Sequence, residues 1–140
     1  IRDRFNKVIP QANQIEINPF QQKTEAIAAL QGEGIAVEAW APFAEGKNDI
    51  FHNPELSKIG TKYGKFEAQV ITRWQVERDI IVVAKSTKPE RMAENLNVFD
   101  FALSDEDEAE IAKLDGMFTA IVNHDTVDNL KRIAAWKTGQ

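Results

Sequence analysis

The stretch Ile80-Ile-Val-Val-Ala-Lys-Ser-Thr-Lys-Pro-Glu-Arg-Met-Ala-Glu-Asn95 is where the fold of this chain is easiest to infer. Its β-branched run, Ile80 to Val83, has charged residues on both sides and predicts a strand buried on both faces. A polar turn follows, and Pro89 suits the first turn of a helix. Thr87 and Glu90 have the spacing of a capping box, in which both side chains accept hydrogen bonds from backbone N–H groups. A strand, a basic turn and a capped helix are therefore expected here.

A turn of this kind can bind an anion, because the N–H groups of a helix's first turn are unpaired and the helix dipole favours negative charge there. Lys85 and Arg91 would place positive charges on either side of that point. Ser86 and Thr87 would add hydroxyl groups. Many strand-to-helix turns carry these residue types for structural reasons alone. Residue chemistry therefore leaves both a structural turn and an anion site open.

The composition is that of an ordinary globular protein, with 43% hydrophobic and 28% charged residues in a chain of 140, enough for one domain with a core. A net charge of −5 with scattered basic residues argues against nucleic acid and anionic membranes as partners. The absence of cysteine excludes disulfides, thiolate metal sites and thiol catalysis, and permits a cytoplasmic location. No apolar run approaches the length of a membrane-spanning helix.

The remaining sequence alternates between expected strands and helices, which predicts an α/β fold with parallel strands and right-handed crossovers. Thr24 and Ser104 would each cap a helix, and Ser104 begins a second capping box. The acidic residues after Ser104 are interpreted as complementing the helix dipole rather than as a metal site. Strands are expected at 12–17 and 35–40, and helices at 1–8, 24–31, 55–63, 66–76, 104–114 and 127–136.

Three details qualify this interpretation. Gln14 and Glu16 would lie on the same face of strand 12–17 and would need polar partners inside the protein. No G-x-G-x-x-G sequence follows any expected strand, so a Rossmann dinucleotide site is not supported. The chain begins at Ile1, within an expected helix, and we expect that this is not the natural start of the protein.

Several stretches of the sequence carry a family resemblance. They are Asn13-Gln-Ile-Glu-Ile-Asn-Pro-Phe20, Gly34-Ile-Ala-Val-Glu-Ala-Trp-Ala-Pro-Phe43, Tyr63-Gly-Lys-Phe-Glu-Ala-Gln-Val70, Ile80 to Asn95, Val98-Phe-Asp-Phe101 and Leu103-Ser-Asp-Glu-Asp107. Taken in order, they resemble the C-terminal part of the aldo-keto reductase family. One such stretch would be a weak signal, but their order across residues 8–114 is specific, and Asn123-His-Asp125 is similar to the family's tail.

The resemblance implies that these residues are strands six to eight, with their flanking helices, of a (β/α)8 TIM barrel. On this basis residues 1–140 would be a single partial domain of three parallel strands, with residues 116–140 as a C-terminal tail. The family binds NADPH across the C-terminal ends of the strands. Ala84 and Ala41 depart from the proline and serine that the family usually has at these positions.

The resemblance also assigns eight residues to NADP binding. The glutamine would bond the nicotinamide carboxamide, and the tryptophan would stack on the nicotinamide ring. The next four would hold the adenosine 2′-phosphate, and the last two would contact adenine. In chain order these residues are Gln14, Trp40, Lys85, Ser86, Thr87, Arg91, Glu94 and Asn95.

The family's catalytic Asp, Tyr, Lys and His would all precede residue 1, so we expect no catalytic residue in this chain. Tyr63 matches a helical family position outside the active site, and surface positions are expected for His52 and His124. The intact protein would reduce a small-molecule aldehyde or ketone with NADPH, whereas this chain alone would be inactive. The alternative is a non-catalytic NADP-binding or partner-binding half-barrel.

A sheet of three strands would leave its barrel-facing side and two strand edges exposed. We therefore expect a partner, either the missing N-terminal half-barrel or a second copy of the chain. The loop 43–57 and the tail from Gly116 match the regions of the family's substrate-specificity loops, and nothing in them identifies a substrate. Trp40 makes the chain similar to the bacterial sugar-acid and general carbonyl reductases of the family.

Overall fold

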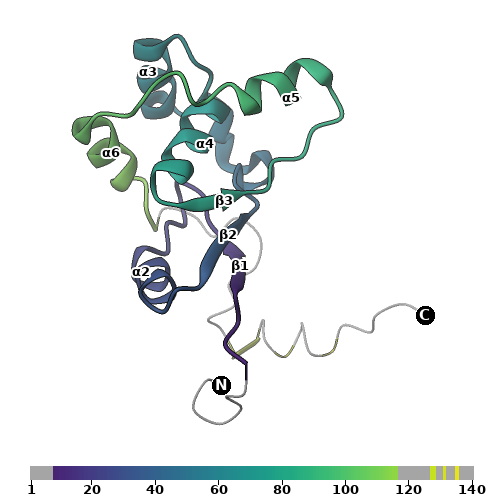
Figure 1. Cartoon of the computed structure of the whole chain (residues 1–140). Coiled ribbons are helices and arrows are strands. Elements are labelled where there is room, and N and C mark those ends of the chain that lie inside the picture. The colour runs from purple at the N-terminus through teal and green to yellow at the C-terminus, as the bar shows by residue number, and fades with distance from the viewer. Residues whose placement is uncertain (1–7, 117–126, 129–130, 132–134, 136–140) are drawn as a thin grey trace.

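The protein, described by a computed structural model at residues 8–116, 127–128, 131 and 135, contains one parallel sheet. The strands are hydrogen-bonded in the order β1-β2-β3, which is also their order in the chain (Figure 1). The α/β class and the three parallel strands expected from the sequence are confirmed. The strands are β1 (Ala12–Glu16), β2 (Ala36–Trp40) and β3 (Ile80–Val82).

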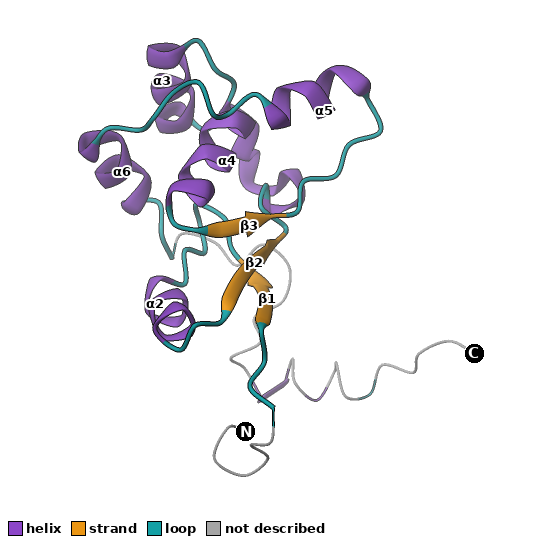
Figure 2. Cartoon of the chain, viewed as in Figure 1, coloured by secondary structure: helices purple, strands orange, loops and turns teal. Residues whose placement is uncertain are grey.

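The helices lie in the connections between the strands and after the last strand (Figure 2). The four long helices expected within residues 24–114 are confirmed, and their ends agree within two residues. Those expected at 1–8 and 127–136 fall largely outside the described residues. Among the described helices, none is long and apolar enough to cross a membrane. The helical segments are α2 (Thr24–Gly32), the 3-10 segment η1 (Ala44–His52), α3 (Pro54–Tyr63), α4 (Glu67–Glu77), α5 (Pro89–Leu96) and α6 (Asp105–Ala112).

One face of the sheet carries the hydrophobic core. Val37 and Ala39 of β2 are completely buried there, and Val37 is paired in register with the buried Ile80 of β3. Helix α4 adds Ile71 and Trp74 to the same cluster. These residues recur at the spacing of one helix face, so the amphipathic pattern of α4 decides which side lies on the sheet.

In the described part of the chain the opposite face of the sheet is open over β3, and here the prediction that the run 80–83 is buried on both faces is wrong. Ile81 is 52% exposed and Val83 is 48% exposed. Alternate residues of a strand point to opposite faces, and the described helices cover only the face of Ile80. The run 80–83 is apolar at every position, so its sequence does not show which face is buried. Among the described residues, helices pack against only one of the two faces.

The two polar residues of β1 on this open face have different environments. Glu16 is only 6% exposed and accepts a hydrogen bond from Asn18 Nδ2 at 3.2 Å, as a buried carboxylate requires. Gln14 is exposed and donates from Nε2 to a carboxylate oxygen of Glu38, its register partner on β2.

Two predicted helix caps are wrong. Lys23, in a left-handed conformation, occupies the N-cap of α2, while the hydroxyl of Thr24 accepts a hydrogen bond from Arg78 at 3.4 Å. Lys88 occupies the N-cap of α5, and no side chain caps that helix, so Thr87 and Glu90 form no capping box. The box at Ser104 is confirmed, because Ser104 and Asp107 each accept the other's backbone N–H.

Candidate functional site

An open groove of ≈ 590 Å³ lies where the turn between β3 and α5 faces the start of α4. The turn and α5 form one wall of the groove. Five of the eight residues that the resemblance assigned to NADP binding line this wall: Lys85, Ser86, Arg91, Glu94 and Asn95. They come from one short stretch of chain, and the helix places the last three on the same side of α5.

The other wall was not anticipated from the sequence. It is formed by Phe43, which directly precedes η1, by Phe51 near the end of η1, and by Phe66 at the start of α4. The rings of Phe43 and Phe51 are tilted at 51° with their centroids 5.8 Å apart. Aromatic faces beside cationic groups suit a ligand with a flat ring and an anionic group. Phe43 lies three residues after Trp40, so this wall continues directly from the end of β2.

The basic turn leaves its charges available to the groove. Within the described residues, Lys85, Lys88 and Arg91 make no ion pair with a carboxylate. Ser86 shapes the turn by accepting the backbone N–H of Lys88 at 3.1 Å. The missing side-chain cap on α5 adds to this, because the first-turn N–H groups of an uncapped helix are free to bind an anion.

The other three assigned residues lie outside the groove lining. Thr87 is exposed in the turn and does not contribute to the wall. Gln14 and Trp40 lie on the open face of the sheet, where Trp40 pairs in register with Glu16. The structure therefore divides the set into a groove beside α5, whose lining carries the carboxylates of Glu67, Glu90 and Glu94 as well as cations, and a polar and aromatic surface on β1 and β2.

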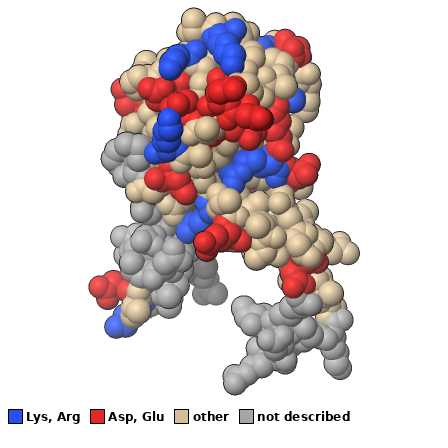
Figure 3. Space-filling model, turned by 90° about the vertical axis from the view of Figure 1, so that its left-hand side faces the viewer, with Lys and Arg blue, Asp and Glu red and all other residues tan. Residues whose placement is uncertain are grey.

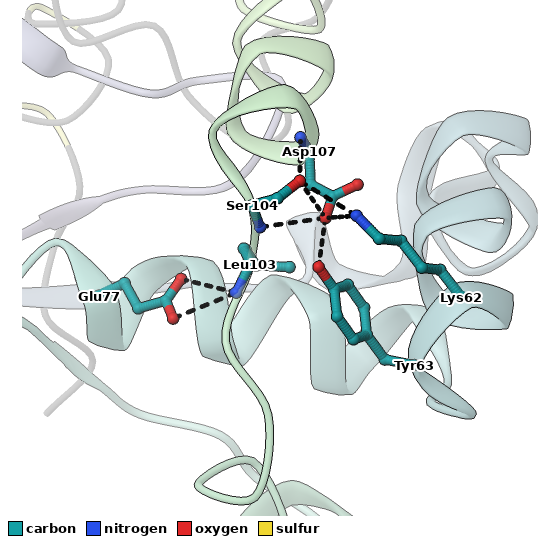
Figure 4. A network of polar contacts seen from close by, with 6 residues as sticks. All are labelled: Lys62, Tyr63, Glu77, Leu103, Ser104 and Asp107. Carbon is teal, nitrogen blue, oxygen red and sulfur yellow. Dashed lines mark hydrogen bonds and ion pairs between the residues drawn. The ribbon is translucent and has the colours of Figure 1, made fainter.

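The single tyrosine belongs to a separate polar cluster that ties α3 to α6 (Figure 4). Asp107 Oδ2 accepts hydrogen bonds from Lys62 Nζ at 2.8 Å, Tyr63 Oη at 2.5 Å and Ser104 N at 3.1 Å. Burial by itself raises the pKa of Asp107, but these donors outweigh it and lower the pKa to about 2. The cluster shares no residue with the groove, so its contacts explain it as a structural link.

His52 is not part of that cluster. His52 lines the groove, where its Nδ1 lies 2.8 Å from Asp49 Oδ1, and its side chain is 80% exposed, which agrees with the expected surface position. His124 lies outside the described residues. Within the described part of the chain, no group of three acidic or histidine side chains could hold a metal ion.

Charges of both signs are interspersed over the face formed by α2, α3 and α6 (Figure 3). Blue and red side chains alternate there without a continuous basic surface. Nucleic-acid binding requires a row of cations that matches the phosphate backbone. This face offers no such row, and the absence of a nucleic-acid partner stays a prediction.

Comparison with known proteins identifies the family. The family model described as "Aldo/keto reductase family" matches residues 3–116. The chain belongs to the aldo/keto reductase family. Methylglyoxal reductase DkgA of Escherichia coli (strain K12) is 39% identical over 108 residues, which are 77% of this chain and 39% of that protein.

Solved structures, several of them named as aldo-keto reductases, share the fold of this chain. MGS-M4, from a Medee basin deep-sea metagenome library, superimposes with a TM-score of 0.82 and 32% identity, covering 89% of this chain and 46% of that one. A mutant of Gox0644 in complex with NADPH superimposes with a TM-score of 0.76 and 34% identity. The match covers 81% of this chain and 41% of that one. The three parallel strands thus belong to a TIM barrel, as expected. The chain spans about two-fifths of the length of the relatives it matches.

Proposed function

We propose that this chain provides the NADPH-binding part of an enzyme that reduces aldehydes or ketones by hydride transfer. The observation that carries the proposal is the pair Lys85 and Arg91, which line one groove without an ion pair to any described residue. A phosphate dianion would supply the missing counter-charge through charge-assisted hydrogen bonds. The NADPH-bound relative, at 34% identity, supports the choice of cofactor.

The groove end of the site would hold the adenosine half of the cofactor. Lys85, Ser86, Thr87 and Arg91, with the start of α5, would bind the 2′-phosphate. Adenine would lie beside Glu94 and Asn95, which line the same groove one turn after Arg91. NAD lacks the 2′-phosphate, so two cations committed to that group favour NADP over NAD.

The sheet end of the site would hold the nicotinamide. Gln14 has an amide that can pair with the carboxamide, and Trp40 has a flat ring on which nicotinamide can stack. Both come from the same open face, Gln14 within β1 and Trp40 at the end of β2. NADPH supplies the hydride when it is bound, and these two side chains would orient its ring toward a small carbonyl substrate.

The proton donor would come from outside this chain. The catalytic Asp, Tyr, Lys and His of the family are expected before residue 1. Tyr63 is a poor substitute, because its hydroxyl already donates to Asp107 and lies outside the groove lining. We therefore include in the proposal that these 140 residues alone do not turn over substrate.

The second candidate function is a half-barrel that binds NADP or a partner without catalysis. It is favoured by the exposed apolar side chains of Ile81 and Val83 on the open face. Either function calls for a partner at this face, the N-terminal half-barrel or a second copy of the chain. We also propose a cytoplasmic location, which cell fractionation would test.

Arg91→Ala tests the phosphate assignment. We expect about 10- to 100-fold weaker NADPH binding, because a charge-assisted hydrogen bond to phosphate is lost, while NADH binding stays unchanged. Titration of the 140-residue chain with NADPH and, separately, with NADH measures the two affinities from the fluorescence of the reduced nicotinamide. Lys58→Ala is the control, since Lys58 is exposed, lies 3.9 Å from Glu55 and is not part of the groove lining. Unchanged NADPH affinity in Arg91→Ala would reject the assignment.

A further inference from the structure

The open face of the sheet has a polar pair at its centre. The register places Gln14 of β1 directly beside Glu38 of β2, and Gln14 Nε2 donates a hydrogen bond to Glu38 Oε1. The neighbour of Glu38 on its other side is Ile81 of β3, which has no polar group in its side chain. Across the sheet, Glu38 is therefore directed toward the glutamine.

This contact determines which way the Gln14 amide points. An ionised carboxylate can only accept hydrogen bonds, whereas an amide has one donor end and one acceptor end. If the amide were flipped, Oε1 of Gln14 would face an oxygen of Glu38 and both would be repelled. Glu38 thus holds the NH2 group toward β2 and leaves Oε1 of Gln14, which accepts no hydrogen bond from the described residues, available as an acceptor.

We propose that Glu38 is a positioning residue, which fixes Gln14 so that its Oε1 accepts a hydrogen bond from the NH2 group of the nicotinamide carboxamide. This inference rests on the proposed function. Glu38 acts through Gln14 rather than on the reacting atoms. The orientation of the Gln14 amide matters because the bound carboxamide would set how the nicotinamide ring lies on Trp40. Trp40 is two residues after Glu38 on the same face of β2.

The test compares oxidised NADP with its 3-acetylpyridine analogue, in which a methyl group replaces the NH2 group of the carboxamide. The wild-type chain should prefer NADP about three- to tenfold, because only NADP can donate to Oε1 of Gln14. Glu38→Gln has almost the same shape but can pair with either orientation of the amide, so the preference should fall to about one. Glu25→Gln, an exposed change of equal charge on α2, should keep the preference.

Each outcome has one meaning. If Glu38→Gln keeps the wild-type preference, or weakens both ligands by the same factor, the positioning role is wrong while the proposed function stands. If the preference survives Gln14→Leu, the nicotinamide assignment of Gln14 is wrong, and the role of Glu38 falls with it. If the wild-type chain binds neither ligand, both the proposed function and this inference are overturned. Circular dichroism of each variant confirms that the fold is retained.

Discussion

Asp107 shows what a single side chain contributes to this protein. It accepts hydrogen bonds from Lys62 and Tyr63 on α3 and from Ser104 before α6. Its pKa of about 2 is below the value of about 4 expected for an unfolded chain. The charged form therefore favours the folded state, and the link between α3 and α6 depends on it.

Asp107→Asn should lower the free energy of unfolding at pH 7 by about 1–2 kcal/mol, a figure reduced for solvent screening at the half-exposed Lys62. Because the pKa of Asp107 is lower in the folded protein, its carboxylate stabilises the fold at pH values above the pKa of the unfolded chain. This contribution is lost as the pH falls from about 4 to about 2. The difference between wild type and variant should shrink over that range. Denaturant unfolding at pH 7, 4 and 2.5 measures it.

The matched control for Asp107 is Asp105→Asn, since Asp105 is an exposed residue in the same first helical turn. Its effect should be within about 0.5 kcal/mol at every pH. A difference between wild type and Asp107→Asn that does not change with pH would contradict the role of the carboxylate charge.

Residue patterns predicted one wall of the groove but not the other. Lys85, Ser86 and Arg91 are within seven residues of each other, so a strand followed by a helix brings them together by local geometry alone. Phe51 and Phe66 reach the same groove from distant parts of the chain. Their position depends on how η1 and α4 pack, and no local pattern encodes that.

At the scale of elements, the end of α3 comes close to the segment leading into α4. Gly60 lies within α3, and its carbonyl accepts the N–H of Lys65 at 2.8 Å. A Cβ atom added at Gly60 would lie 2.4 Å from the carbonyl oxygen of Lys65. The short connection between the two helices therefore requires a residue without a side chain here.

Gly60→Ala should lower the free energy of unfolding by about 2 kcal/mol, because the backbone of Lys65 must move to avoid the new methyl group. Gly32→Ala is the matched control. A Cβ atom there meets nothing within 4 Å, and alanine favours a helix by about 1 kcal/mol, so this variant should be unchanged or more stable. Thermal unfolding of Gly60→Ala and Gly32→Ala compares the stability of the two variants with that of the wild type. Equal effects would contradict the close approach.

The helix ends show where sequence patterns fail at this scale. Ser104 caps α6 as predicted, because its partner Asp107 is only three residues away. The hydroxyl of Thr24 instead accepts a hydrogen bond from Arg78. Helix α5 has Lys88 at its N-cap, one residue after the predicted N-cap Thr87. A capping residue can be diverted by a distant donor, which is a tertiary event.

At the scale of the whole molecule, the sheet has a covered face and an open one. The open face exposes Ile81 and Val83, and the outer edges of β1 and β3 pair with no described strand. Unpaired edges and exposed apolar residues favour association with another polypeptide.

Mixing this chain with the N-terminal half of a barrel reductase should give a complex that oxidises NADPH in the presence of a simple aldehyde. This chain alone should form a homo-oligomer on gel filtration and show no turnover, because our proposal places the proton donor outside these 140 residues. Absorbance at the NADPH band follows the reaction, and mass spectrometry gives the stoichiometry. Turnover by the chain alone, or a stable monomer at its own mass, would contradict this.

By itself the sequence determined the α/β class, the parallel direction of the strands, most helix positions and the basic turn at Lys85 to Arg91. All of these depend on hydrophobic periodicity and on contacts between residues close in the chain. Only the tertiary structure decided which face of the run 80–83 is covered, which aromatic residues complete the groove, and that Glu38 holds Gln14. The physical reason is that burial and side-chain pairing are set by elements distant in sequence, whose packing no local pattern specifies.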